Sequence, residues 1–384
     1  MAHHEKEGHH VQIVRLERGS PCNLDIAALR KVLLAHNVKN LPVMVVSVAG
    51  TFRKGKSFLM NFFLRYMRNR TQQNWMADTN APLQGFPWRG GSQPETSGIL
   101  IWSEVFVVTT TEGRKVAVVF MDTQGMFDCT STIKDGATLF AFSMMASSVQ
   151  IYNLSQNIGE DHLQHLQLFT QYGKLALEET GEKPFQKVIF LVRDWQYPYE
   201  WAYGFTGGKG LAEKRLSADE AQEPELKGVR KDIFSSFEEI WCFLMPEPGT
   251  KVTSEKTFDG RLSDMDKDFQ EYLGVLVSSV LQPNELVVKK INGCDITCEE
   301  LFYHLEIYAK LFNKGDLPGP KSMFEVLHRG KPYLLSSHLE LEHFRVKSSA
   351  LDLFDRVSKF GGVARSQQYK NRLEHVRITK QHLA

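Results

Sequence analysis

One stretch, residues 41–58 (LPVMVVSVAGTFRKGKSF), constrains the fold of this chain more than any other. The run Val43–Val48 is rich in valine and almost continuously apolar, which is typical of a strand buried on both faces. It leads directly into Gly50-Thr-Phe-Arg-Lys-Gly-Lys-Ser57, the G-x-x-x-x-G-K-S pattern of a phosphate-binding loop. A chance glycine-rich turn is the alternative. The buried strand before the loop and the helix-compatible segment after it argue against that alternative.

The residue types of this loop suit a bound triphosphate. Glycines at both corners, Gly50 and Gly55, let successive backbone N–H groups turn onto phosphate oxygens without interference from a side chain. We expect Lys56 to reach the β and γ phosphates and the Ser57 hydroxyl to bind Mg²⁺. The helix that begins here would direct the positive end of its dipole at the same anion.

Length and charge narrow the class of protein. At 384 residues the chain is longer than the usual single domain, so one large or two unequal domains are expected. A net charge of +1 gives no electrostatic reason to expect a nucleic-acid partner. The cysteines number five and show no C-x-x-C spacing, which favours reduced thiols in the cytosol.

No membrane-spanning helix is expected in this sequence. Residues 1–10 are polar and rich in histidine, unlike the apolar segment of a secretory signal. The longest uncharged stretch, 136–159, is interrupted throughout by Ser, Thr, Asn and Gln, which makes it too polar for a hydrocarbon core. We expect it to form a buried helix (137–145) followed by a buried strand (148–152).

Strand-like and helix-like segments alternate along most of the chain, which predicts an α/β domain with a doubly wound, mostly parallel sheet. The predicted strands are 11–17, 43–48, 99–109, 116–121, 148–152, 188–194 and an apolar strand from Cys242. The predicted helices are 25–35, 56–68, 137–145, 160–180, 231–241, 266–281 and 298–312. A Gly- and Pro-rich stretch at 313–320 is the strongest linker signal. We therefore divide the chain into a disordered tail (1–10), a P-loop domain (11–313), a linker (314–322) and a short, shortened-looking helical segment (323–384).

Two further motifs fall where a phosphate loop that works with Mg²⁺ needs them. An apolar strand ends in Met121-Asp-Thr-Gln-Gly125, a D-x-x-G pattern, so that Asp122 can hold Mg²⁺ through water and the Gly125 amide can contact the γ phosphate. Thr96, in the flexible stretch before that strand, is the candidate that closes on Mg²⁺ from the other side. Alone, D-x-x-G is a weak pattern, and an ordinary loop threonine is the alternative for Thr96.

Arg193 and Asp194 close the apolar strand VIFLVRD. A carboxylate at this place can accept both N1–H and N2–H of guanine, a bidentate contact that adenine does not offer. The alternative is a surface ion pair. Further along, the strand from Cys242 ends in a Pro-rich turn at Pro246–Pro248, which is placed to cap a base.

Together these residues resemble the atlastin family, membrane-anchored GTPases of the dynamin superfamily, and more distantly the guanylate-binding proteins. The resemblance rests on segments found in the family's order, and it covers about Val11–Met323: SVAGTFRKGKSFLMNFFLRYM, GFPWRGGSQPETSGILIWSE, MDTQGMFD, FLVRDWQYPYE and LPGPKSM. It implies a GTPase head that forms homodimers under the control of GTP, followed by a linker, a three-helix middle domain and a membrane anchor. Such proteins tether and fuse membranes of the endoplasmic reticulum from its cytosolic face.

The resemblance also implies roles for single residues. It assigns catalysis to Arg53, Lys56, Ser57 and Thr96, Mg²⁺ binding to Ser57, Thr96 and Asp122, and GTP or GDP binding to Gly50, Arg53, Lys54, Gly55, Lys56, Ser57, Phe58, Gln124, Gly125, Arg193 and Asp194. In this family Arg53 matches an arginine finger supplied in cis, which would neutralise charge on the leaving oxygen. A solvated loop arginine is the alternative.

Two departures from the family pattern bear on function. Met126 follows D-T-Q-G where the family usually has a small residue. After Lys321–Met323 the sequence resumes in what resembles a later part of the family's middle domain, so we expect about one helix of that domain to be missing and no membrane anchor in this sequence. We therefore expect a cytoplasmic protein that meets membranes only indirectly, that pairs with itself or with other atlastin-like heads, and that does not fuse membranes alone.

Three functions remain open on these grounds. The first is an active GTPase whose cycle drives head-to-head dimerisation. The second is a nucleotide-gated interaction module with weak or no hydrolysis. The third is an unrelated P-loop ATPase or kinase, against which the Arg193–Asp194 pair argues.

Overall fold

A computed structural model describes residues 8–15, 23–52, 54–72, 74–89, 96–125, 133–177, 183–217, 223–291 and 293–313. Arg53, Met126, the predicted linker and the predicted helical segment 323–384 lie outside the described residues.

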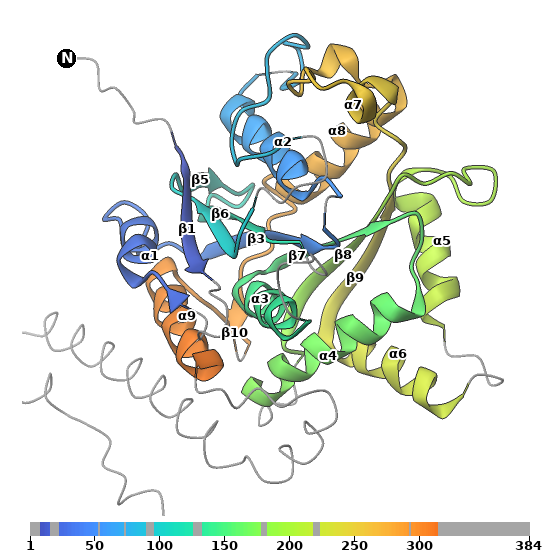
Figure 1. The fold of residues 1–384 in the computed structure, drawn as a ribbon. Coiled ribbons are helices and arrows are strands. Elements are labelled where there is room, and N and C mark those ends of the chain that lie inside the picture. Colours follow the sequence, from blue (N-terminus) through green and yellow to red (C-terminus); the bar gives the residue numbers. More distant parts are fainter. Residues whose placement is uncertain are drawn as a thin grey trace, which may run out of the picture. The chain divides into compact units, whose positions relative to one another are not determined.

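A single large sheet forms the centre of the described region (Figure 1). Its strands are ordered β2 (Asn23–Leu24), β1 (His10–Arg15), β4 (Ile99–Trp102), β6 (Lys115–Thr123), β3 (Val43–Gly50), β7 (Val149–Ser155), β8 (Phe185–Arg193) and β9 (Phe237–Leu244), and β5 (Phe106–Thr109) also pairs with β6. The strands from β6 to β9 in this order run parallel to their neighbours, whereas β1, β2, β4 and β5 pair antiparallel. The predicted mostly parallel sheet is therefore confirmed.

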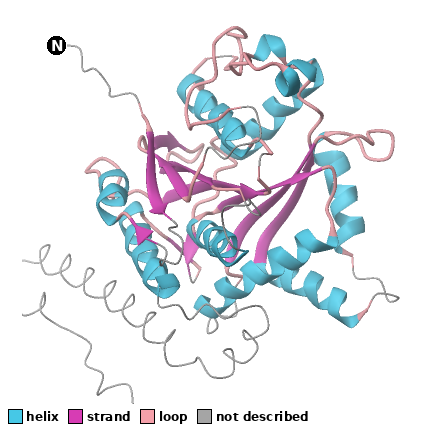
Figure 2. Cartoon of the chain, viewed as in Figure 1, coloured by secondary structure: helices cyan, strands magenta, loops and turns pink. Residues whose placement is uncertain are grey.

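Helices cover both faces of the sheet (Figure 2). One apolar core packs α2 (Lys56–Asn69) and α8 (Lys267–Leu281) on one face. The other core packs α1 (Ile26–Leu33), α3 (Ile133–Ala146), α4 (Glu160–Leu177), α6 (Pro224–Ser236) and α9 (Cys298–Asn313) on the opposite face. The remaining elements are α5 (Gly204–Leu216), α7 (Thr250–Ser254), the 3₁₀ turn Leu262–Asp264, β10 (Lys290–Ile291) and β11 (Cys294–Asp295). The predicted doubly wound arrangement is thus confirmed.

The order of the strands determines where a ligand can bind. From β3 the chain crosses to β6 on one side, and later to β7, β8 and β9 on the other. Strand β3 pairs with β6 from Val43 opposite Ala117 onward, and with β7 as far as Gly50 opposite Asn153. Parallel sheets bind ligands at the carboxyl ends of the strands where the order reverses, which here is the end of β3.

Three predicted boundaries are wrong, each for a physical reason. The predicted helix 231–241 ends at Ser236, because Phe237–Leu244 pairs with β8 as strand β9. The predicted strand 99–109 is two strands, which pair with successive parts of β6 on either side of a break at residues 103–105. Strand β1 begins at His10, inside the predicted tail, and pairs with Trp102.

None of the helices in the described ranges combines the length and the apolar content needed to cross a bilayer.

Candidate functional site

The phosphate loop lies between β3 and α2, and its two glycines are required where they stand. Gly50 has a φ of 144°, and a Cβ there would lie 2.1 Å from the Asn153 carbonyl oxygen. Gly55 has a φ of 71°, in the left-handed region, and immediately precedes α2. The Asn153 side chain on β7 donates a hydrogen bond to the Lys54 carbonyl oxygen at 2.9 Å. The neighbouring strand therefore holds the loop in its turn, a role that the sequence pattern did not reveal.

Lys56 is the first residue of α2 and is almost fully buried. Its ammonium donates to the Thr51 carbonyl oxygen at 3.0 Å, which folds the side chain back over the loop. A cation in this place faces the anion that the loop amides would bind. The predicted position of Lys56 relative to the loop is the one the structure has.

Three oxygen-bearing side chains from distant parts of the chain meet beside this loop. The Ser57 hydroxyl donates to Asp122 Oδ2 at 2.6 Å, and the Thr96 hydroxyl donates to the same oxygen at 3.2 Å. Ser57 Oγ and Thr96 Oγ1 are themselves 3.1 Å apart. The structure therefore brings together all three residues that the sequence predicts as Mg²⁺ ligands.

The environment of Asp122 suits a divalent cation. Asp122 is fully buried, and burial raises the pKa of its carboxyl to about 6 in spite of hydrogen bonds from Ser57 and Thr96 and the charge of Lys56. Within the described part of the chain its Oδ1 atom has no hydrogen-bond partner. One carboxylate and two hydroxyls are hard oxygen donors of the kind Mg²⁺ takes, with phosphate oxygens and water as its other ligands. The described residues contain no cluster of three or more His, Cys, Asp or Glu side chains, so this mixed oxygen set is the candidate metal centre.

The D-x-x-G segment lies directly against the phosphate loop. A Cβ on Gly125 would lie 2.4 Å from the Phe52 Cα atom, so only glycine fits there. Gln124 is held by Gly98, since the Gly98 N–H donates to Gln124 Oε1 and the Gln124 N–H donates to the Gly98 carbonyl, both at 2.8 Å. This pair of bonds joins the segment after β6 to the segment that carries Thr96. The prediction that Gln124 contacts the nucleotide is not tested by this geometry.

Arg193 and Asp194 lie at the end of β8 and differ in exposure. The Arg193 guanidinium is buried, lies 3.3 Å from the position of a Cβ on Gly55 and packs 5.7 Å from the centre of the Phe269 ring. Burial lowers its pKa, while the charge of Asp194 opposes that shift. Asp194 has a φ of 57° and is partly exposed. The left-handed turn at Asp194 thus separates a buried cation under the loop from a carboxylate that reaches the cavity.

A cavity of about 390 Å³ connects these groups. Its walls include Lys54, Gly55, Lys56, Ser57, Phe58, Thr96, Gly125, Arg193 and Asp194, all of which were predicted from sequence. Sequence reasoning missed most of its far wall, which consists of Trp88, Arg89 and parts of residues 248–258. Phe58, Trp88 and Phe258 pack their rings 5.0–6.0 Å apart and so join that wall to α2.

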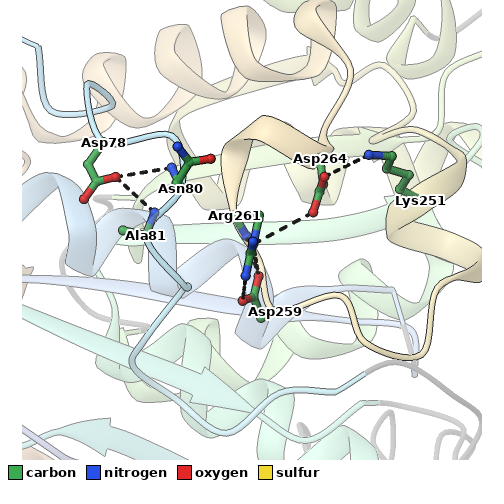
Figure 3. A network of polar contacts seen from close by, with 7 residues as sticks. All are labelled: Asp78, Asn80, Ala81, Lys251, Asp259, Arg261 and Asp264. Carbon is green, nitrogen blue, oxygen red and sulfur yellow. Dashed lines mark hydrogen bonds and ion pairs between the residues drawn. The ribbon is translucent and has the colours of Figure 1, made fainter.

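A polar network supports the far wall from outside (Figure 3). Asp264 bridges Lys251, at 3.0 Å, and Arg261, at 3.9 Å, and Arg261 also donates to Asp259 at 2.9 Å. Backbone bonds from Leu83 to Asp259 and from Ser263 to Thr79 tie this segment to the one before Trp88. Two segments far apart in sequence therefore form one wall of the cavity.

The strand–loop–helix unit and the oxygen cluster define this chain as a P-loop nucleotide-binding protein. The family model for the guanylate-binding protein N-terminal domain matches residues 21–290. The chain therefore belongs to this family. Identities of 49% to human Atlastin-2 and 47% to rat Atlastin-1 place it among the atlastins, GTPases of the dynamin superfamily.

The similarity to atlastins covers nearly the whole chain. Human Atlastin-2 is 49% identical over 375 residues, which are 91% of this chain and 64% of that protein. Rat Atlastin-1 is 47% identical over 388 residues, with 95% of this chain and 70% of that protein covered. Human Atlastin-3 is 47% identical, with coverage of 95% and 72%. The chain thus spans slightly under two thirds of the length of human Atlastin-2.

Among solved structures, the bacterial selenocysteine-specific elongation factor EF-Sec aligns with 63% of this chain and 30% of that chain at 11% identity. The TM-score of 0.24 is too low to inform either fold or function.

Proposed function

We propose that this chain binds GTP together with Mg²⁺ and hydrolyses it to GDP and phosphate. The observation that carries the proposal is the meeting of Ser57, Thr96 and Asp122 within 3.2 Å of one another, beside Lys56 and at one side of a cavity that Asp194 also lines. Two hydroxyls that meet at one buried carboxylate beside a phosphate loop are the arrangement that a Mg²⁺–triphosphate complex needs.

Each side chain has a distinct task in this proposal. The loop amides and Lys56 hold the β and γ phosphates, and the Gly125 amide contacts the γ phosphate. Ser57 and Thr96 would hold Mg²⁺, and Asp122 would help to hold it. The metal ion, when bound, neutralises charge on the bridging phosphate oxygens. Arg53, which lies outside the described residues, acts as the arginine finger, a contribution on the order of 10³ to 10⁵ in rate.

Guanine selectivity is assigned to Asp194. Asp194 lines the cavity together with Pro248 and Val252. A carboxylate accepts from guanine N1–H and N2–H, whereas adenine N1 is itself an acceptor. The chain should therefore select GTP over ATP.

Phosphate release measured with GTP and with ATP, with and without Mg²⁺, tests this function. Mg²⁺-dependent release from GTP alone is expected. Tight GTP binding without release would favour the nucleotide-gated interaction module instead, and release from ATP would contradict the guanine assignment. Arg53→Ala should lower turnover far more than nucleotide affinity, because the finger acts on charge that develops in the transition state.

We also propose that the nucleotide controls homotypic association. Gln124 and Gly98 connect the segments on which the γ phosphate would act, so both would respond together to its presence. A non-hydrolysable GTP analogue should shift the chain from monomer to dimer, GDP should do so less, and Thr96→Ala should abolish the shift. Light scattering that gives one mass in all three nucleotide states would contradict this association. The cytosolic face of the endoplasmic reticulum and a part in membrane fusion are proposed for the natural protein on the strength of its relatives.

A further inference from the structure

Strand β9 is the last strand in the order of the large sheet, and no other described strand pairs with its outer edge. It pairs with β8 on one side, and on the other side Leu244 bridges Gly204, the first residue of α5. The Cys242 carbonyl oxygen also points outward, since a Cβ on Gly208 would lie 2.0 Å from it. Met245, by contrast, bonds inward to Val192. Backbone groups in a strand alternate in direction, so those of Ile240 and Glu238 also point outward.

Helix α5 lies beside β9 along this edge (Figure 1). Its residues at intervals of four, Gly204, Gly208, Ala212 and Leu216, change from glycine to alanine to leucine along the side that follows β9. Without side chains, the first two let the helix backbone touch Leu244 and Cys242. Farther along the helix, Ala212 and Leu216 line a cavity beside β9. The outer edge therefore contacts α5 at Cys242–Leu244, whereas no described backbone group bonds to the outward N–H and C=O of Ile240.

A cavity of about 630 Å³ lies beside Ile240, at the outer edge of β9. It touches both faces of β9, because Ile240 and Cys242 point to one face and Trp241 to the other. Phe205, Leu216 and the half-exposed Phe234 supply further apolar walls, and Ser279 and Gln282 supply polar ones. A strand that adds to a sheet places its alternate side chains on opposite faces of that sheet. A cavity that touches both faces of β9 can receive such side chains.

The charges at this edge favour a basic occupant. Glu213 and Glu285 line the cavity with a single ammonium, Lys209, and Glu238 is exposed on the strand two residues from Ile240. Lys187 is paired within the chain, since its ammonium lies 3.0 Å from Glu239 and 3.6 Å from the centre of the Trp241 ring. Among these groups three carboxylates outnumber one lysine, Lys209, whose ammonium lies 4.0 Å from Glu213.

We infer that this edge binds a short extended peptide of a partner protein, which adds to β9 as a further strand. Its main chain would exchange hydrogen bonds with the outward N–H and C=O groups of Ile240 and Glu238. Alternate apolar side chains would enter the cavity on the two faces of the sheet, and flanking Lys or Arg residues would face Glu213, Glu238 and Glu285. The nucleotide site lies elsewhere on the chain and shares none of these residues.

The test uses the full chain and fluorescein-labelled peptides in which Thr alternates with Val, Leu or Phe between Lys-rich ends. Fluorescence anisotropy should show saturable binding by at least one of them, and glutamate in place of the lysines should weaken it. Hydrogen exchange should slow at the Ile240 amide. Ile240→Pro removes that outward N–H but no bond to β8, and it should weaken binding roughly tenfold or more, whereas Ile240→Val should not.

Ala212→Leu, which fills the cavity without changing the strand, should weaken binding as well and serves if the proline variant does not fold. GTP turnover should be unchanged in all these variants. Failure of all the lysine-flanked peptides to bind would overturn the inference, as would binding by Ile240→Pro and Ala212→Leu with the same affinity as the unsubstituted chain. The glutamates would then serve to prevent pairing at the edge. A nucleotide-independent dimer that Ile240→Pro dissolves would overturn it in favour of a second copy of this chain.

Discussion

The carboxyl and amino ends of the parallel sheet differ in whether their buried polar groups have hydrogen-bond partners. Around the phosphate loop, five buried side-chain atoms have no hydrogen-bond partner within the described residues: Thr51 Oγ1, Asp122 Oδ1, Asn153 Oδ1, and Nε and Nη1 of Arg193. At the amino end, the fully buried Lys289 donates to the Ser147 carbonyl oxygen at 2.9 Å, just past the end of α3. Among the described residues, Gln186 Oε1 is a buried side-chain atom without a hydrogen-bond partner at that end.

The contrast separates polar groups that serve the fold from those that serve a ligand. The last carbonyl groups of a helix lack partners within the helix, and Lys289 supplies a donor to the one at Ser147, just past the end of α3. Buried polar atoms without partners destabilise a fold by about 1–3 kcal/mol each. Their concentration at one end is what the proposed binding of phosphate and a metal ion there requires.

The largest expected effect compares two buried lysines, one from each end. Lys56→Ala should lower GTP turnover by at least about 100-fold and weaken nucleotide binding, because the cation beside the phosphates is lost. Lys289→Met should leave both unchanged, since its ammonium contacts α3 and not the cavity. Steady-state phosphate release and fluorescent-nucleotide titration measure the two effects. Similar losses in both variants would break the proposed division between the ends.

The second prediction concerns Asp122, whose burial should act against stability until a ligand binds. The pKa of its carboxyl rises from 3.8 in the unfolded chain to about 6 in the folded one. Only the folded state binds the extra proton between those values, so nucleotide-free stability falls as pH rises through that window and stays lower above pH 6. Asp122→Asn should therefore raise the free energy of unfolding at pH 7.5 by about 3 kcal/mol in the absence of ligand.

The same substitution should remove the Mg²⁺ dependence of nucleotide binding. Urea unfolding without Mg²⁺ and nucleotide titration with and without Mg²⁺ give the two readouts. A variant that is less stable and still responds to Mg²⁺ would remove Asp122 from the metal centre.

Local sequence patterns predicted the carboxyl end of the sheet well. The phosphate loop, the D-x-x-G motif and the Arg193–Asp194 pair each follow a buried strand in the sequence, and the structure places each at a strand end beside the cavity. Parallel strands meet at one edge, so these three local patterns suffice to place most of the site.

What the sequence did not predict depends on contacts between distant segments. Helix α5 contains four glycines, at 204, 207, 208 and 210, which lower its helix propensity, but two of them, Gly204 and Gly208, allow its close approach to β9. Residues 237–241 continue from a helix and were predicted as helical, although pairing with β8 makes them a strand. The support of the loop by Asn153 and the far wall at 248–258 likewise follow from tertiary packing, which no local pattern reports.

A third prediction tests the amino end through pH. Burial lowers the pKa of Lys289 from 10.5 to about 7, while the charge of Glu238 opposes the shift. Between those values the unfolded chain binds a proton that the folded chain does not, so stability should rise with pH through this window. The expected slope is about 1 kcal/mol per pH unit, and Lys289→Met should remove it. Urea unfolding of both proteins at pH 7.5 and pH 9 measures the difference, and equal slopes would show that Lys289 is protonated in the fold.

The smallest expected effect concerns a glycine remote from both ends. Gly228 lies within α6, and a Cβ there would meet no atom within 4 Å. Gly228→Ala should therefore stabilise the chain by roughly 0.5–1 kcal/mol through higher helix propensity, without any change in turnover. Gly208→Ala in α5 is the matched control, because its Cβ would lie 2.0 Å from the Cys242 carbonyl oxygen and should push the helix off the edge of β9. Chemical denaturation should give opposite signs for the two variants. The same sign in both would mean that glycine in α5 does not serve to bring the helix onto the strand.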